Sequence, residues 1–270
     1  SKVRSARAAN QLAAIAMGLA VVGILYGAFV AYAQDDLKKL IAYASVSHLG
    51  FIILGLFAMT HSAVEGAILH MVNHGIFTSG LLLCAGILYE RRNTQLIADF
   101  GGLAKQVPVF SALFLIFTLS CIGLPGTNGF VGEFLIVAGT LGEALSSHLD
   151  LTLPGLKLVT SWRVLVTVFA ALAAMGLIFS AVYMLSMFRR VMFGPLTHED
   201  NKTMADLSGR EISYLAPLVV LIFLIGLWPN IFLSKMHKSV DAFISANKAE
   251  ITSIRSPETS RAKQPRRTVQ

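Results

Sequence analysis

The sequence predicts an all-α membrane protein, a polytopic helix bundle with about six transmembrane spans, one of which is a discontinuous helix. Hydrophobic residues make up 55% of its 270 residues and charged residues only 14%, and the mean hydropathy is +0.68. A soluble domain must present a polar exterior, whereas a helix solvated by lipid can be apolar on all sides. This composition excludes a cytosolic enzyme, a disordered chain and a disulfide scaffold.

Each span needs about 20 mostly apolar residues to cross a hydrocarbon layer of about 30 Å. The first is expected at about Gln11 to Gln34, and the second at about Leu40 to Thr60, after the polar turn DDLKK. The third occupies about Ala63 to Tyr89. After the broken fourth span, a fifth is expected at about Val164 to Phe188 and a sixth at about Ile212 to Leu233.

The fourth span runs from Pro108 to Leu145 and is interrupted by the segment GLPGTNG at residues 123–129. Pro125 lacks a backbone donor, and glycines, including Gly126 and Gly129, permit non-helical dihedral angles. An interrupted helix exposes backbone groups that only protein or a water-filled cavity can satisfy in a membrane. A cavity is therefore predicted beside this break.

These features divide the chain into three parts. Residues 1–9 are interpreted as an external connector, residues 10–234 as the transmembrane domain, and residues 235–270 as a basic tail that changes from amphipathic to disordered. Because the chain starts with Ser1 and no small-residue cleavage pattern follows, we expect a truncated or processed start rather than a signal peptide.

The net charge of +7 does not indicate a nucleic-acid partner, because Lys and Arg flank the spans and fill the tail. Short loops on one side carry nine of them, Lys38, Lys39, Arg91, Arg92, Lys105, Arg189, Arg190, Lys202 and Arg210, and the opposite loops carry two, Lys157 and Arg163. The rich side is predicted to be cytoplasmic, which places both chain ends outside. Cys84 and Cys121 lie in apolar runs without ligand spacing, so they predict neither a disulfide nor a metal site.

Few ionisable residues lie within the apolar spans, and these are the candidates for function. His48 is in the second span, His70 and His74 share one face of the third, and Glu133 follows the break. Placing a charge at the bilayer centre costs about 2.5–3.5 kcal/mol on insertion scales, so such groups are retained mainly for ion or proton pathways. We interpret Glu133 and the histidines His48, His70 and His74 as candidates for a proton or cation pathway.

Several structural alternatives apply to the same residues. A lone histidine such as His48 is also typical of a helix–helix hydrogen bond. The HxxxH pair also suits a metal ion, but no carboxylate or thiol is spaced to complete a site, so no metal is predicted unless other helices supply partners. Lys38 and Lys39 are secondary candidates for proton transfer, although they fit a solvated turn. Like Glu65, they lie near span ends, where long side chains can reach water.

Three runs make the sequence closely resemble the antiporter-like membrane subunits of respiratory complex I. They are DDLKKLIAYASVSHLGF (residues 35–51), EGAILHMVNHGIFTSGLLLCAGILYERRNT (65–94) and GLPGTNGFVGEFLI (123–136). The resemblance covers about residues 10 to 235. In the broken twelfth helix of this family, M subunits (chain 4) have Glu where L and N subunits have Lys, and this chain has Glu133. It also has Thr78 where L subunits have Lys.

By this resemblance the chain corresponds to helices nine to fourteen of fourteen, the C-terminal half of an M-type subunit. His48 and His74 would then be proton-transfer residues of a central hydrophilic axis, and Glu133 would be the terminal proton-exchange residue. His70 is a secondary candidate, because the residue type at this position varies among related subunits. The first half of such subunits supplies a Glu and several Lys residues that are absent from this chain. The missing N-terminal half would therefore be a partner of this chain in the same subunit.

The resemblance implies a proton-translocating subunit of NADH:quinone oxidoreductase in a bacterial inner membrane, next to L and N subunits. It also implies no cofactor on this chain, because NAD, FMN, iron–sulfur clusters and quinone bind to partner subunits. Two alternatives stay open. One is a subunit of a multi-subunit sodium/proton antiporter or a membrane-bound hydrogenase, and the other is a structural remnant without activity.

Overall fold

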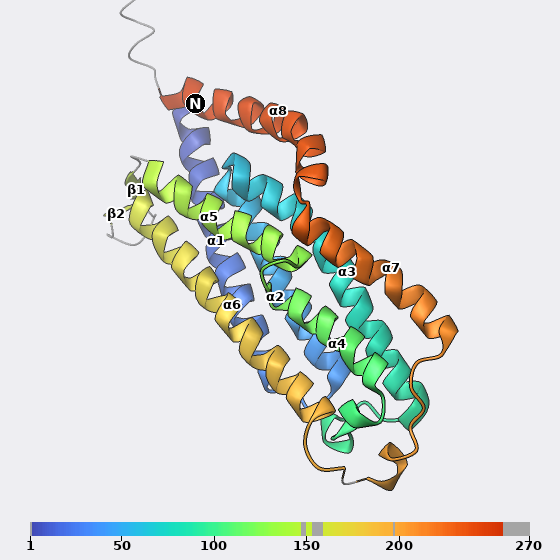
Figure 1. Cartoon of the computed structure of the whole chain (residues 1–270). Coiled ribbons are helices and arrows are strands. Elements are labelled where there is room, and N and C mark those ends of the chain that lie inside the picture. The colour runs from blue at the N-terminus through green and yellow to red at the C-terminus, as the bar shows by residue number, and fades with distance from the viewer. Residues whose placement is uncertain (1, 147–149, 153–158, 197, 256–270) are drawn as a thin grey trace, which may run out of the picture.

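Helices dominate the computed structural model, which describes residues 2–146, 150–152, 159–196 and 198–255 (Figure 1). The helices are α1 (Lys2–Tyr32), α2 (Leu37–Ala58), α3 (His61–Arg92), α4 (Pro108–Cys121), α5 (Asn128–Ser146), α6 (Trp162–Met192), α7 (Gly209–Leu227) and α8 (Asn230–Arg255). Short 3-10 turns lie at Ile97–Asp99, Leu103–Lys105 and Glu199–Asn201. Two short antiparallel strands, β1 (Asp150–Thr152) and β2 (Val159–Ser161), lie between α5 and α6. The predicted all-α class is confirmed, with this strand pair as a small addition.

Five of the six predicted spans correspond to single helices, and the predicted broken span corresponds to α4 and α5. Among the described residues, α1 from Gln11 onward, α2, α3, α6 and α7 are each long and apolar enough to cross a membrane. Helix α4 has 14 residues, about 21 Å at 1.5 Å per residue, which is too short to cross alone. It is followed by α5, and Figure 1 shows the two helices in series with an unwound segment between them.

The sixth span ends at Leu227, six residues earlier than predicted. The apolar sequence continues past this point, but Pro229 interrupts it because proline disfavours helical geometry in the residue before it and supplies no backbone donor. The chain then turns, and Asn230 begins α8, which runs across the end of the bundle (Figure 1).

Helical structure extends into both chain segments that flank the predicted transmembrane domain. From Lys2 on, the expected connector at 1–9 is a helical continuation of the first span. The expected amphipathic start of the tail corresponds to α8, which extends to Arg255. The expected disorder falls on residues 256–270, which lie outside the described part of the chain.

The basic loops gather at one end of the bundle, as their alternation predicts. Ion pairs connect them there. Arg91 Nη2 lies 2.9 Å from Glu211 Oε2, and Arg190 Nη2 lies 3.4 Å from Asp35 Oδ1. The start of α1 and the whole of α8 lie toward the opposite end (Figure 1). The assignment of the basic end to the cytoplasm stays a prediction.

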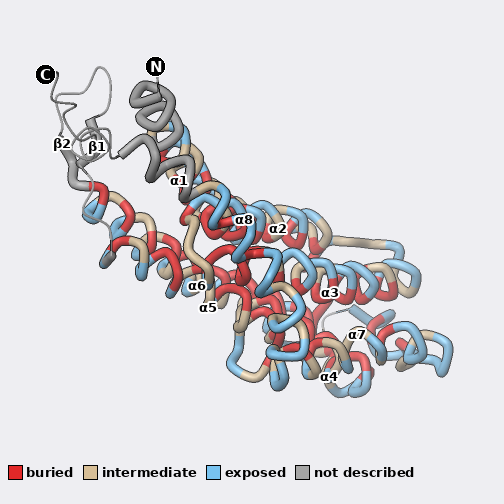
Figure 2. Tube along the Cα trace, turned by 90° about the horizontal axis from the view of Figure 1, so that it is seen from above, coloured by how far each residue is buried: buried red, intermediate tan, exposed pale blue. Residues whose placement is uncertain are grey.

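The outer faces of the bundle are apolar, and its interior contains several buried polar and ionisable residues. Leu19 on α1 is 66% exposed, Ile178 on α6 is 64% exposed and Val220 on α7 is 63% exposed. Figure 2 shows such exposed positions along the outer faces of the helices, with buried positions turned toward their neighbours. This is the reverse of a soluble protein and fits helices solvated by lipid. The functional candidates must therefore be sought inside.

Candidate functional site

Glu133 lies in the second turn of α5, inside the bundle, where only 2% of the residue is exposed. Its Oε1 atom lies 3.1 Å from Nδ1 of His48 on α2. The same atom lies 3.9 Å from Nε2 of His70 on α3. Both histidines are buried. The fold thus brings one carboxylate and two imidazoles from three different helices into one cluster.

His74 adds a third imidazole to this cluster. The ring centroid of His48 lies 5.5 Å from that of His70 and 5.7 Å from that of His74. Both α3 histidines therefore face the same neighbour, as their spacing predicts. Phe77 packs against the group, with its ring centroid 5.0 Å from His48. His74 is half-buried and is the most exposed of the three.

The polar atoms of the cluster are poorly satisfied by the protein itself. Both ring nitrogens of His70 and Nε2 of His74 have no hydrogen-bonding partner in the described part of the chain. His48 Nδ1 and Glu133 Oε1 face each other at 3.1 Å but without the geometry of a hydrogen bond. By contrast, the buried hydroxyls of Ser47 and Thr118 donate to backbone carbonyls. Buried polar groups are normally paired, so this concentration of unpaired atoms distinguishes the cluster from the rest of the described interior.

His48 links the cluster to both halves of the broken helix. Its Nε2 lies 3.3 Å from Sγ of Cys121, the last residue of α4. Its Nδ1 faces Glu133 in α5. One imidazole therefore contacts the ends of α4 and α5 that the unwound segment separates.

The predicted break residues lie where the helix unwinds. Pro125 and Gly126 belong to the segment between α4 and α5, and Gly126 has a φ of +94°, which favours glycine. Gly129 lies in the first turn of α5, where a Cβ atom would collide with the carbonyl of Ser120. The backbone hydrogen bond from Leu124 to the Leu119 carbonyl, 3.0 Å, closes the end of α4. The break thus combines a proline, which has no backbone N–H, with glycines that permit a positive φ and a close backbone approach.

A hydrogen-bonded brace that we did not predict holds the break against α3. Asn73 Nδ2 donates to the backbone carbonyl of Asn128, 2.7 Å. Ser120 Oγ donates to Oδ1 of Asn128, 2.5 Å. All three residues are fully buried. An amide at position 73, between the two α3 histidines, was the available signal in the sequence, because a polar residue in an apolar span requires a partner.

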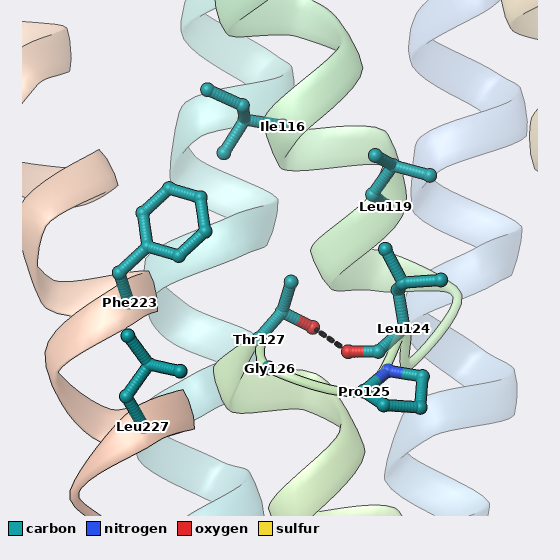
Figure 3. A pocket seen from close by; sticks show the side chains of 8 residues that line it. All are labelled: Ile116, Leu119, Leu124, Pro125, Gly126, Thr127, Phe223 and Leu227. Carbon is teal, nitrogen blue, oxygen red and sulfur yellow. Dashed lines mark hydrogen bonds between the residues drawn. The ribbon is translucent and has the colours of Figure 1, made fainter.

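A pocket of about 220 Å³ lies beside the break. Figure 3 shows the side chains that line it, Ile116, Leu119, Leu124, Pro125, Gly126, Thr127, Phe223 and Leu227. The Thr127 hydroxyl donates to the Leu124 carbonyl, 2.7 Å, so it is already satisfied within the break. The cavity predicted here is present, but its wall is mostly hydrocarbon, half of it from α4 and α7 and half from the break itself.

The structure does not bring Lys38 and Lys39 to the cluster. Both lie in the first turn of α2, ten and nine residues before His48, about 15 and 14 Å along a helix axis. Lys38 is half-buried, and its Nζ lies 4.9 Å from the centroid of the Tyr89 ring. Lys39 is exposed. This placement fits the alternative of a solvated turn at the basic end.

Glu65 is more deeply buried than the sequence predicts. It was expected to reach water, but only 4% of the residue is exposed. Its carboxylate contacts His61 in the same helix and His237 in α8. No pattern in the sequence predicts the contact with His237, because this residue is 172 positions away from Glu65.

The buried cluster also has the composition of a metal site. Ligand atoms of His48, His70 and Glu133 all lie within 4.8 Å of one another. The carboxylate that the HxxxH pair lacks in sequence comes from α5, and His48 rather than His74 completes the triad. The geometry thus allows proton transfer between imidazole and carboxylate, and it also provides three metal donors.

Comparison with known proteins identifies the family of this chain. A sequence profile described as "NADH:quinone oxidoreductase/Mrp antiporter, TM" matches residues 3–149. The chain is 39% identical over 236 residues to "NADH-quinone oxidoreductase subunit M" of Rhodobacter capsulatus, a match that covers 87% of this chain and 42% of that protein. The chain spans less than half the length of this relative.

Solved structures give the same result. A chain of respiratory complex I from Thermus thermophilus with bound NADH is similar at a TM-score of 0.75 and 34% identity, over 87% of this chain and 45% of that one. The Mrp complex from a Dietzia species shares the fold at a TM-score of 0.71 and 17% identity, over 90% of this chain and 49% of that one. The chain therefore belongs to the transmembrane family shared by NADH:quinone oxidoreductases and Mrp antiporters.

Proposed function

We propose that the chain is part of a proton-translocating membrane subunit of an NADH:quinone oxidoreductase. The observation that carries this proposal is the buried contact between Glu133 and His48, 3.1 Å, with His70 beside it. The cluster lies within spans that otherwise expose hydrocarbon, where an ionisable group is retained mainly for ion or proton movement. The name of the Rhodobacter capsulatus relative supports the assignment to this enzyme.

The geometry suggests how a proton moves through the cluster. Nδ1 of His48 and Oε1 of Glu133 are close enough to exchange a proton after a small rotation of either side chain. The 3.9 Å between Glu133 and His70 is longer than a hydrogen bond, so this step needs a bridging water or a new rotamer. His74, half-buried, would connect the cluster to the next group along the path.

Movement of a proton onto or away from Glu133 would alter how strongly His48 holds its own proton. Opposite charges a few ångström apart stabilise each other, and this effect is strong where water is excluded. A change in charge elsewhere in the enzyme can therefore be passed along the buried residues one step at a time. The proposal needs no redox centre on this chain.

The wider setting is part of the same proposal. NAD, FMN, iron–sulfur clusters and quinone would be bound by other subunits, and L and N subunits would lie on either side in a bacterial inner membrane. Because the chain spans less than half of its relative, the complete path would also use residues from the remaining part of such a subunit. Three bundled histidines and one carboxylate provide only one section of it.

A native gel of mildly solubilised membranes tests the assignment to the enzyme. The gel is probed for this chain and stained in place for NADH dehydrogenase activity. Co-migration of the chain with a large NADH-active band is expected. Migration in an assembly without NADH activity would contradict the proposal.

A sodium/proton antiporter is the second candidate, since the matching family profile covers both enzymes and antiporters. It predicts proton movement that depends on sodium and proceeds without NADH. Inverted membrane vesicles distinguish the two functions. Our proposal predicts that NADH acidifies the vesicle interior equally well in sodium-containing and sodium-free buffer. Proton movement that a sodium gradient drives in the absence of NADH would favour the antiporter.

A further inference from the structure

A second cluster of ligand-type side chains lies where α8 crosses the first turns of α3. It consists of His61 and Glu65 from α3 with His237 and Asp241 from α8. In each helix the two residues are four positions apart, so they share one face. The proton path described above does not use any of them. The cluster joins two segments that are far apart in the sequence.

Glu65 is the centre of this group. Its side chain is only 5% exposed, and its two oxygens face different imidazoles. Nδ1 of His61 lies 3.4 Å from Oε2, and Nδ1 of His237 contacts Oε1. The two imidazole rings have centroids 5.2 Å apart. Ligand atoms of the three residues all lie within 4.8 Å of one another.

His61 and Glu65 are spaced like two ligands in the first coordination shell of a tetrahedral metal ion. Nitrogen and oxygen ligands bind Zn²⁺ at about 2.0–2.2 Å, so two of them lie about 3.4 Å apart at a tetrahedral angle. The distance between His61 Nδ1 and Glu65 Oε2 has this value. Two histidines and one glutamate are also a ligand set that zinc commonly uses.

Asp241 provides an independent argument for metal binding. Its Oδ1 lies 3.0 Å from Nε2 of His61, on the ring nitrogen opposite to the one that faces Glu65. Histidines that bind metals usually donate their second N–H to a carboxylate, which fixes the tautomer and the ring orientation. With Nε2 protonated and bound to Asp241, Nδ1 of His61 is left with its lone pair directed toward the cluster.

We propose that His61, Glu65 and His237 bind a divalent transition-metal ion, Zn²⁺ in the first instance, and that Asp241 positions His61. Three protein ligands leave a fourth position for water. The ion would fasten α8 to α3, which otherwise meet through a small buried apolar cluster of Val64, Val240 and Ile244. The ion would link the two helices at the end of the bundle opposite to the basic loops.

Metal content tests this proposal. The membrane assembly that contains the full chain is purified in detergent, stripped with a chelator and incubated with Zn²⁺ alone. Bound zinc is then measured by mass spectrometry and calorimetric titration. Wild type should bind one ion per chain more than the His237→Gln variant. His237 has a side chain that is 47% exposed, so its substitution leaves the packed interior intact.

Further variants separate this site from other histidines. His198→Gln, in an exposed turn, should bind as much zinc as wild type. Asp241→Asn should bind about 10–100-fold more weakly, as expected for a carboxylate that orients a ligand. Equal zinc content in wild type and His237→Gln would overturn the proposal. Loss of the ion from His48→Gln, with retention in His237→Gln, would also overturn it by moving the ion to the buried cluster.

Discussion

Nδ1 of His48 lies 3.1 Å from Oε1 of Glu133, and both side chains are buried between α2 and α5. The other ring nitrogen of His48 lies 3.3 Å from Cys121, at the end of α4. A single imidazole of α2 therefore touches both halves of the broken helix. Any movement at the break would therefore change the distance between His48 and Glu133.

Removal of the His48 imidazole should interrupt proton transfer. The His48→Gln variant keeps a polar side chain of similar length but has no ring nitrogen that can accept and release a proton. We expect proton translocation to fall by about 100-fold, the usual contribution of a positioned acid or base. NADH-driven acidification of inverted vesicles measures this change. His198→Gln, outside the cluster, should pump normally, and normal pumping by assembled His48→Gln would exclude His48 from the path.

The brace between α3 and the break should contribute to stability. Asn73→Leu removes the side-chain amide that donates to the Asn128 carbonyl. The expected loss is about 0.5–1.5 kcal/mol in the free energy of unfolding, the net contribution of one hydrogen bond. Denaturant unfolding of the detergent-solubilised protein measures it. The matched control is Asn247→Leu, which removes only a bond to the Phe243 carbonyl within α8 and should cost less. Equal losses in the two variants would show that the brace has no special role.

Contact between α5 and α3 should set the position of Glu133. A Cβ atom at Gly132 would lie 2.8 Å from Cβ and Nδ1 of His70, so Gly132→Ala must push the two helices apart. We expect a destabilisation of about 1–3 kcal/mol and reduced proton pumping. Gly142→Ala on the same helix meets no atom within 4 Å and should leave pumping unchanged. Equal activity of both variants would mean that the cluster tolerates this displacement.

Features determined by local chemistry were predictable from the sequence. The spans follow from apolar length, and the break at Pro125 and Gly126 follows from the missing N–H and the need for a positive φ. The shared face of His70 and His74 follows from helical spacing. The end of the sixth span at Leu227 was missed, because an apolar sequence continues beyond Pro229 and masks the proline signal.

Features determined by packing between helices were not predictable. Helical spacing does not determine which α3 histidine faces Glu133, because that depends on how α5 rotates against α3. The structure places His70, at 3.9 Å, beside the carboxylate. Likewise, the contact of Glu65 with His237 joins residues 172 positions apart, and nothing in either local sequence points to the other.

The measurement that tests the central claim most directly is NADH-driven proton pumping by the Glu133→Gln variant in an assembled complex. Glutamine preserves the size of the side chain but carries no exchangeable acid proton. The complex should transfer electrons from NADH to quinone, migrate at its normal size on a native gel and fail to acidify inverted vesicles. Glu90→Gln, an exposed carboxylate at the end of α3, should pump normally. Full pumping by assembled Glu133→Gln would contradict the role assigned to Glu133.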